Sequence, residues 1–378
     1  MDDPEIRGLQ TVAQREELLL APYAMHSRDS AGRRYPEDVQ AYRGPFQRDR
    51  DRILHCSAFR RLSGKMQVFT GDMGDYHRTR LTHTHEVASI ARTIARGLRL
   101  NEDLVEALAL FHDIGHAPFG HAGEDALNEC LADVGGFSHN QHALTVVEEI
   151  EERYPGFPGL NLSFEVLEGQ AVRVQKASSA CTPLLEVQVV DAADSITYDA
   201  HDTDDAMKLG MVSLDELSSI PLVGRMLQRV RQRHANLHGG LLRKALVHEL
   251  IDCQVTDVLM IAGAFLSRGD LRSADDVRRS EFKLGPSAEL AEQKRELEAF
   301  LYRHVYRHPK LLAVRVAAQQ RLRAMFAELV RRPDLLPSRF RGRPAKVGLQ
   351  RSAGEYLASM TERFCDEQFD RYFHGSLG

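Results

Sequence analysis

The residues best suited to chemistry stand in the string HDIGHAPFGH, at positions 112–121. His112 and Asp113 follow an apolar run that ends at Phe111, so an imidazole and a carboxylate meet at the end of a predicted helix. Such a pair suits a borderline divalent cation such as Mn²⁺, Fe²⁺, Co²⁺ or Zn²⁺, whereas Mg²⁺ would prefer more oxygen ligands. The pattern indicates part of a metal site.

Histidines are concentrated around this string. Eight of the 17 histidines lie between residues 77 and 142. We expect Gly115 to end the helix before it, which puts His116 on a loop and His121 at the start of the next helix. Because imidazole binds metals and moves protons near neutral pH, the clustering favours a catalytic role.

A catalytic cation needs ligands from more than one element, together with open positions for water and substrate. His83 stands near the start of a predicted helix, and Asp194 lies in a strongly helical segment. His85 and Asp191 compete with them. Asp191 precedes Asp194 by three residues on nearly the same helix face, so spacing alone does not choose between the two. The candidate ligand set is His83, His112, Asp113 and Asp194.

Composition sets limits on the class of protein. The chain has 378 residues, of which 43% are hydrophobic and 27% charged, enough for a packed core and an ordinary surface. A formal net charge of −5 does not by itself attract nucleic acid or an anionic membrane. The acidic N-terminus resembles no signal peptide, no apolar stretch approaches membrane-spanning length, and the five cysteines form no CxxC pair. We therefore expect a cytoplasmic protein with reduced thiols.

Apolar residues recur at intervals of three and four along most of the chain, which is the helical period. The clearest case consists of Val87, Ile90, Ala91, Ile94, Ala95 and Leu98. Similar periodicity occurs at 104–111, 141–150, 184–200, 241–266, 296–307 and 311–330. Strand signals are nearly absent, so the sequence predicts an all-α fold with about ten or more helices.

Four stretches interrupt this pattern. Residues 28–45 and the Pro- and Arg-rich 333–346 are predicted loops, and 153–161 is a predicted irregular connection. The highly charged stretch 268–297 is expected to be solvated or to lie at an interface. The simplest division is an N-terminal arm with an Arg-rich loop (1–45), a helical core (46–265) and a C-terminal helical region packed on it (266–378).

The pattern H…HD…D resembles that of the HD-domain metal-dependent phosphohydrolases. Five longer strings look like one branch, the deoxyguanosinetriphosphate triphosphohydrolase-like family. They are FRRLSGKMQVF (59–69), RLTHTHEV (80–87), HDIGHAPFGHAGE (112–124), GGFSHNQHAL (135–144) and DAADSITYDAHDTDDA (191–206). The resemblance implies an HD-domain helical core with additional C-terminal helices, and it supports the four metal ligands above.

The resemblance also implies a reaction: metal-dependent hydrolysis of a deoxynucleoside triphosphate (dNTP). Water would attack the α-phosphorus, releasing the deoxynucleoside and inorganic triphosphate. The cofactor would be one divalent ion (Mn, Mg, Fe, Co or Ni). His121 is the candidate proton donor or shuttle, because Glu124 lies three residues later on the same predicted helix and can orient it. The resemblance places His116 and His139 beside it, in contact with phosphate.

Several residues are candidates for contacts with the nucleotide. Arg80, three residues before His83, could grip the α-phosphate with its planar donor fork. Asp194, Tyr198 and Asp202 recur at i, i+4 and i+8 on one helix face. Tyr198 can therefore pack on the sugar while Asp202 accepts a hydrogen bond from the 3′-hydroxyl.

Two further residues are expected to contact the substrate, and one residue differs from the pattern of the relatives. The resemblance gives Gln67 a role at the 3′-hydroxyl, and Tyr306 is expected to close the wall that excludes ribonucleotides. Ser195 stands where vertebrate relatives have a phosphate-binding lysine. Other cations must then hold the triphosphate tail, and the candidates are Arg60, Arg61 and arginines of 28–34 and 339–343, the last two groups from a neighbouring subunit.

Two alternatives compete with this function. Another HD phosphohydrolase, such as a deoxynucleoside monophosphatase or a cyclic-nucleotide phosphodiesterase, would not release free triphosphate. A non-catalytic protein that binds nucleotides or single-stranded nucleic acid would not need an intact ligand set. The chain has no GxxxxGK[ST] string, so a P-loop enzyme is unsupported. The resemblance further implies a homo-oligomer and a dNTP effector in addition to the substrate. A local basic groove would leave room for single-stranded DNA as a partner.

Overall fold

The computed structural model describes residues 10–38, 40, 42–68, 78–174 and 182–373. Within these ranges the ordered elements are helices, and the β-bridges are isolated pairs that form no strand. The prediction of an all-α fold is confirmed. Among the described residues, no helix has the length and apolar character needed to cross a membrane.

The first half of the chain supplies the helices around the predicted metal site. They are α1 (Val12–Leu19), α2 (Pro45–Leu54), α3 (Ser57–Arg61), α4 (Arg80–Gly97), α5 (Glu102–Phe111), α6 (Gly120–Cys130), α7 (His139–Thr145) and α8 (Phe164–Val174). Helix α5 packs against α2 and α4, and α7 packs against α8. The connections 112–119, between α5 and α6, and 131–138, between α6 and α7, are short and keep the histidine-rich segments close to one another.

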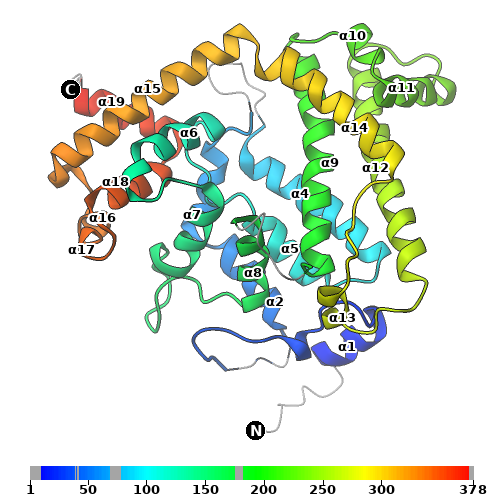
Figure 1. Ribbon diagram of the computed structural model, residues 1–378, viewed down its shortest axis with the longest axis horizontal. Coiled ribbons are helices and arrows are strands. Elements are labelled where there is room, and N and C mark those ends of the chain that lie inside the picture. The colour runs from blue at the N-terminus through cyan, green and yellow to red at the C-terminus, as the bar shows by residue number, and fades with distance from the viewer. Residues whose placement is uncertain (1–9, 39, 41, 69–77, 175–181, 374–378) are drawn as a thin grey trace.

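The second half begins with the long helix α9, which stands beside α4 in the middle of Figure 1. The helices are α9 (Leu185–Lys208), α10 (Leu214–Ser218), α11 (Pro221–Arg233), α12 (Gly239–Leu266), α13 (Ala274–Arg279), α14 (Ala288–Leu301), α15 (Pro309–Arg331), α16 (Ser338–Arg341), α17 (Pro344–Val347), α18 (Leu349–Ala358) and α19 (Glu362–Phe373). Helix α15 packs on α6, α18 and α19, so the C-terminal helices return to the metal-site half of the molecule.

Two hydrophobic cores hold these helices together. The first includes Val87 of α4 and Leu104 of α5, but also Leu322 of α15 and Cys365 of α19. The first core thus takes side chains from both sides of residue 265. The division of the chain between a core and a C-terminal region at residues 265 and 266 stays a prediction. The second core joins the end of α9 to α11, α12 and α14. Helix α9 contributes to both cores and is therefore a rigid support for the side chains between them.

The predicted helical periodicity matches the structure closely. The apolar face predicted for α4 is buried, namely Val87, Ile90, Ala91, Ile94, Ala95 and Leu98. The other six periodic segments fall on α5, α7, α9, α12, α14 and α15, with π-helical turns extending α7 and α14. Most of 28–45 and all of 153–161 are irregular, as expected.

Two expectations about local structure were wrong. Helix α5 ends at Phe111, and His112–Gly115 form a turn instead of continuing the helix to Gly115. Residues 333–346 contain a 3-10 turn and the short helices α16 and α17, because Pro333 and Pro344 have the fixed φ that suits a first helical position. The charged stretch 268–297 is mostly exposed or half-buried, as expected, although Leu290 and Leu297 of α14 are buried in the second core.

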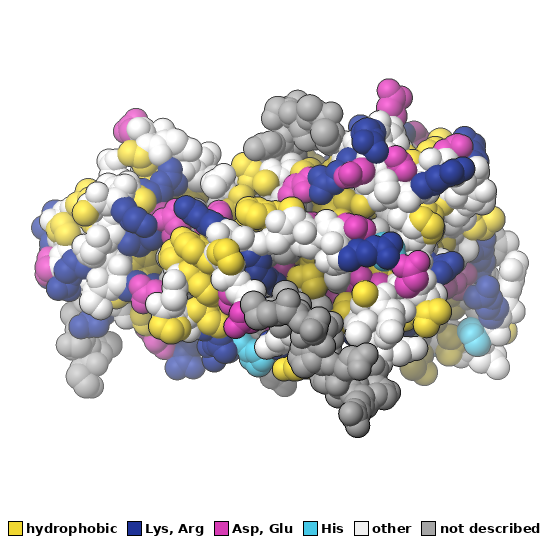
Figure 2. All heavy atoms as spheres, turned by 90° about the horizontal axis from the view of Figure 1, so that it is seen from below, with side chains coloured by type: hydrophobic (Ala, Val, Ile, Leu, Met, Phe, Trp, Pro, Cys, Tyr) yellow, Lys and Arg dark blue, Asp and Glu magenta, His cyan; other side chains and the backbone are white. Residues whose placement is uncertain are grey.

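The surface carries mixed charge. Basic and acidic side chains are interspersed over the face seen in Figure 2, with hydrophobic side chains between them. Of the five cysteines, Cys56, Cys130, Cys253 and Cys365 are free thiols, and Cys181 lies outside the described residues.

Candidate active site

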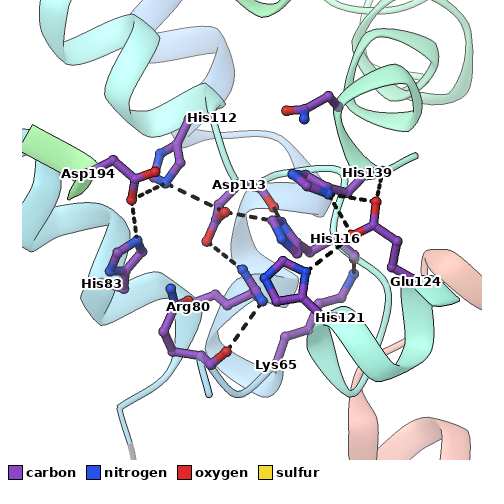
Figure 3. A network of polar contacts seen from close by, with 12 residues as sticks. Lys65, Arg80, His83, His112, Asp113, His116, His121, Glu124, His139 and Asp194 are labelled. Atoms are coloured by element: carbon purple, nitrogen blue, oxygen red, sulfur yellow. Dashed lines mark hydrogen bonds and ion pairs between the residues drawn. The ribbon is translucent and has the colours of Figure 1, made fainter. Parts of the chain in front are cut away.

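The four predicted metal ligands converge from three parts of the chain. His83 comes from α4, His112 and Asp113 from the turn after α5, and Asp194 from α9 (Figure 3). The ligand atoms of His83, His112 and Asp113 lie within 4.8 Å of one another. One Asp194 carboxylate oxygen lies 3.1 Å from His83 Nε2 and 3.8 Å from His112 Nε2. The site thus brings together two imidazoles and two carboxylates.

Local structure explains how α4 and α5 present these side chains. Thr79 caps α4 by accepting a hydrogen bond from the Thr82 amide at 3.2 Å, which sets the first turn that carries His83. Asn101 caps α5 in the same way. Because α5 ends at Phe111, His112 and Asp113 both lie on the turn that follows the helix.

Gly115 allows the turn after α5 to pack directly on α7. A Cβ atom at this position would lie 2.0 Å from the His139 carbonyl oxygen and 2.5 Å from the Ala143 nitrogen. Its φ is not positive, so it does not end the helix by a left-handed conformation. The glycine is needed for close approach, and this approach brings His139 beside the turn.

The protonation and hydrogen bonding of His112 fit a metal ligand. Its Nδ1 lies 2.6 Å from the Ala109 carbonyl oxygen, to which it can donate, and its buried Nε2 has no hydrogen-bond partner. Burial lowers the pKa of His112, which favours the neutral imidazole that binds metals. Burial alone would raise the pKa of Asp113, but His116 and Arg80 hold it well below its usual range. The donor set therefore fits a divalent cation.

The two competing residues lie elsewhere. His85 is exposed and contacts the ring of Phe59 edge-on, with 5.9 Å between ring centroids. Asp191 pairs with Arg173 at 2.6 Å. Neither belongs to the group of ligand atoms around His112, so the tertiary structure separates Asp194 from Asp191 where spacing did not.

A second histidine group adjoins the first. His116 Nδ1 lies 3.1 Å from Asp113 Oδ1, and its ring stacks on His139 with centroids 3.8 Å apart. His139 Nδ1 lies 2.8 Å from both oxygens of Glu124. The ligand atoms of His116, Glu124 and His139 also lie within 4.8 Å of one another, so a cation could bind here as well.

Glu124 is shared unequally between two histidines. The predicted contact with His121 is present at 3.4 Å, but the His121 side chain is 71% exposed. The contact with His139 is shorter and comes from a less exposed side chain. Burial alone would raise the pKa of Glu124, but hydrogen bonds with both histidines hold it well below the usual value. The carboxylate is therefore charged and orients His139 more firmly than His121.

Arg80 is buried and turned toward the metal ligands. Its Nη1 donates to Asp113 Oδ2 at 2.9 Å, and its Nη2 donates to the backbone carbonyl of Gln67 at 3.4 Å. Its Nε has no partner. In this arrangement the guanidinium orients Asp113.

One cavity of about 710 Å³ contains almost the whole predicted site. Every predicted site residue lines it except Glu124 and Asp202. These two carboxylates instead hydrogen-bond to the lining residues His139 and Tyr306. A cavity of this size suits a ligand as large as a nucleotide.

The cavity lining also has aromatic and polar groups. Tyr198 and Tyr306 stack with centroids 5.9 Å apart, and the Tyr306 hydroxyl donates to Asp202. Burial raises the pKa of Asp202 to about 7. The side-chain oxygen of Gln67 is buried without a partner, so it is available to accept a hydrogen bond.

Sequence reasoning missed two arginines of this cavity, Arg173 at the end of α8 and Arg315 on α15. Neither stands in a motif, and only the packing of helices brings them to the site. The guanidinium of Arg315 lies 5.9 Å from the centre of the Tyr306 ring. None of the arginines suggested for the triphosphate tail, Arg60, Arg61 and those of 28–34 and 339–343, lines the cavity of this chain.

Comparison with known proteins defines the class and then the family. Residues 80–199 match the HD domain, and residues 284–371 match the phosphohydrolase-associated domain. The chain is therefore a hydrolase of the HD phosphohydrolase class.

Relatives cover nearly the whole chain. Deoxyguanosinetriphosphate triphosphohydrolase-like proteins of Geobacter sulfurreducens and Thiobacillus denitrificans are each 42% identical to it, over 94% and 93% of this chain and 95% and 97% of their own lengths. The one from Nitrosomonas europaea is 41% identical over 94% of this chain and 98% of its own length. The chain belongs to the deoxyguanosinetriphosphate triphosphohydrolase-like family, which confirms the resemblance inferred from the five strings.

Proposed function

We propose that the protein hydrolyses deoxynucleoside triphosphates to a deoxynucleoside and inorganic triphosphate. Water adds to the α-phosphorus, the bond between that phosphorus and the 5′ oxygen breaks, and the 5′ oxygen takes up a proton. The observation that carries the proposal is the joining, in one cavity, of a metal-ligand set, a histidine group and a polar aromatic end. The names of the relatives point to the same substrate class.

His83, His112, Asp113 and Asp194 would hold the divalent ion. When bound, such an ion acidifies a water molecule and neutralises charge on a phosphoryl oxygen. Mixed imidazole and carboxylate ligation favours Mn²⁺, Fe²⁺ or Co²⁺ over Mg²⁺. Arg80 keeps the Asp113 carboxylate in place and offers its free Nε toward the α-phosphate.

Proton transfer to the 5′ oxygen falls to the second histidine group. The sequence favoured His121 for this role, but the shorter contact of Glu124 supports His139. With Nδ1 held by the carboxylate, Nε2 of His139 is the atom free to give up a proton. His116 lies between His139 and Asp113 and can contact a phosphate oxygen, while the exposed His121 can exchange protons with solvent.

The nucleoside would occupy the end of the cavity formed by Gln67, Tyr198 and Tyr306. The free oxygen of Gln67 can accept a hydrogen bond from the 3′-hydroxyl. Asp202 already accepts a hydrogen bond from the Tyr306 hydroxyl. Its carboxylate would therefore be shared between Tyr306 and the 3′-hydroxyl of the sugar. The stacked tyrosines leave a flat apolar wall against which an extra 2′-hydroxyl would be poorly solvated.

Arg173 and Arg315 are the described cavity cations, apart from Arg80, that can hold the β- and γ-phosphates. Arg173 is paired with Asp191 on the half-exposed rim, so an incoming phosphate can take over that contact. Arg173 and Arg315 would thus replace the lysine that vertebrate relatives have at the position of Ser195.

The test is product identification. Purified protein is incubated without oxygen with Mn²⁺, Mg²⁺, Fe²⁺ or Co²⁺ and the four dNTPs, singly and mixed, and the products are separated by chromatography. We expect equal amounts of deoxynucleoside and triphosphate. Orthophosphate or pyrophosphate as the first product would refute the proposal, and hydrolysis only in mixtures would reveal a dNTP effector.

A further inference from the structure

The corner between α18 and α19, residues 358–362, contacts the two loops that carry active-site residues. These loops are the segment 64–67, which ends at Gln67, and the segment 116–121. The contacts join residues 243 to 296 positions apart in the sequence. The corner therefore lies against the site by tertiary packing alone.

Glu362 makes the first contact. One of its carboxylate oxygens accepts hydrogen bonds from the backbone amides of Met66 at 2.9 Å and Phe119 at 3.2 Å. Met66 precedes Gln67, and Phe119 lies two residues before His121 in a left-handed conformation with φ of 66°. A single charged acceptor thus joins the backbones of both loops, and such hydrogen bonds are stronger than neutral ones.

Lys65 makes the second contact. Its buried amine, whose pKa burial lowers to about 7, donates to the His116 carbonyl at 2.5 Å and to the Ala358 carbonyl at 2.9 Å. Ala358 is the last residue of α18, where the helix dipole favours a cation. The lysine therefore ties the same two loops to the other end of the corner.

Close packing makes the third contact. A Cβ atom at Gly64 would lie 2.8 Å from Thr361 Cγ2 and 2.9 Å from Thr361 Cβ. The backbone before Lys65 and the side chain of Thr361 therefore approach as closely as a glycine permits. Hydrogen bonds at both ends of the corner and this contact in its middle fix its distance from the loops.

Backbone hydrogen bonds connect the segment 64–67 to the start of α4, which carries Arg80 and His83. The Gln67 amide donates to the Arg78 carbonyl at 3.1 Å, and the Arg80 amide donates to the Lys65 carbonyl at 2.9 Å. Arg80 in turn holds Asp113. A shift of Met66 would therefore move both Gln67 and the guanidinium that orients a metal ligand.

We propose that the α18–α19 corner is a positioning element of the active site, with Glu362 fixing the loop of Gln67 relative to the turn that carries His116 and His121. The inference rests on the proposed function for its kinetic consequence. Glu362 touches no reacting atom; it acts through the residues on the two loops. The C-terminal region thereby contributes to the geometry of the active site.

The test compares Glu362→Ala and Glu362→Gln with wild type. Glu367→Ala on the same helix is the matched control, because Glu367 is half-exposed and pairs only with the exposed Arg363 among the described contacts. We expect Glu362→Ala to lower kcat by about 10²-fold, since a misplacement of 1 Å can have that effect. KM should change less and bound metal should stay the same. Glu362→Gln should recover part of kcat, because its amide oxygen still accepts a hydrogen bond.

Hydrogen–deuterium exchange supplies a readout that does not depend on turnover. The amides of Met66 and Phe119 should exchange faster in Glu362→Ala than in wild type or Glu367→Ala. Wild-type kcat in Glu362→Ala, or a loss of kcat that follows only the lost helix content, would overturn the positioning role. A wild-type protein that hydrolyses no dNTP would refute the proposed function instead, while the exchange rates would still test the contact.

Discussion

The cavity contains two histidine groups that differ in their partners. In the first, His83 and His112 face the carboxylates of Asp113 and Asp194, and His112 Nε2 has no hydrogen-bond partner. In the second, His139 stacks on another imidazole and is held through Nδ1 by a carboxylate. The same residue type thus stands in two settings, one whose ligand atoms fit a cation and one in which a carboxylate orients an imidazole.

The comparison shows that partner geometry assigns the role of a histidine. A neutral imidazole with one nitrogen donating to a carbonyl presents a lone pair at the other, as a metal requires. An imidazole whose N–H points to a carboxylate is held in one orientation, with its other nitrogen free for proton transfer. Asp113 contacts both groups, because it lies 3.5 Å from His112 and 3.1 Å from His116.

Removing the shared carboxylate should have the largest effect. We expect Asp113→Asn to abolish metal retention and to lower triphosphate release by roughly 10³-fold or more, because a bound ion supplies several kcal/mol of charge stabilisation. Metal content after dialysis and product release are the measurements. Asp191→Asn is the control for metal content, since Asp191 pairs with Arg173 outside the ligand group. Full metal content in Asp113→Asn would exclude Asp113 as a ligand.

Substitution in the second group should separate proton transfer from metal binding. We expect His139→Gln to reduce kcat by roughly 10²–10⁴-fold with unchanged metal content, as is typical of a lost general acid. His121→Gln should reduce it less, because His121 is more exposed and its contact with Glu124 is longer. Single-turnover rates of both variants make the comparison. A greater loss in His121→Gln would return the role of acid to His121.

The cavity arginines should have the smallest effect, and mainly on substrate binding. We expect Arg173→Ala to raise KM roughly 10–100-fold, the range for a lost hydrogen bond to a charged group. Inhibition by inorganic triphosphate should weaken in parallel. Arg60→Ala, an exposed arginine outside the cavity, should behave as wild type. If Arg60→Ala changes KM and Arg173→Ala does not, the tail contacts are wrongly assigned.

Local sequence was informative wherever a contact follows from helical spacing. The periodic apolar residues of α4 predicted its buried face, and the position of Asp194, Tyr198 and Asp202 on one helix is correct. The metal ligands stand in recognisable strings. Even the contact between His121 and Glu124, three residues apart on α6, is present.

Contacts between helices were harder to predict. Glu124 lies closer to His139, which is 15 residues away across a loop, than to its neighbour on the helix. Arg80 turns to Asp113, and Arg173 reaches the cavity from a segment that has no motif. Gly115 was expected to end a helix, but it serves the close packing of a turn on α7.

By itself, the sequence determined that the protein is helical, which family it resembles, and which histidines and aspartates are candidates for a metal-ligand set. The tertiary structure alone decided which imidazole Glu124 holds, which of two aspartates joins the ligand group, and that Glu362 contacts both active-site loops. The reason is physical. Spacing along the chain sets the face of a helix on which a side chain lies, whereas partners on other helices depend on how those helices cross and on where their loops return.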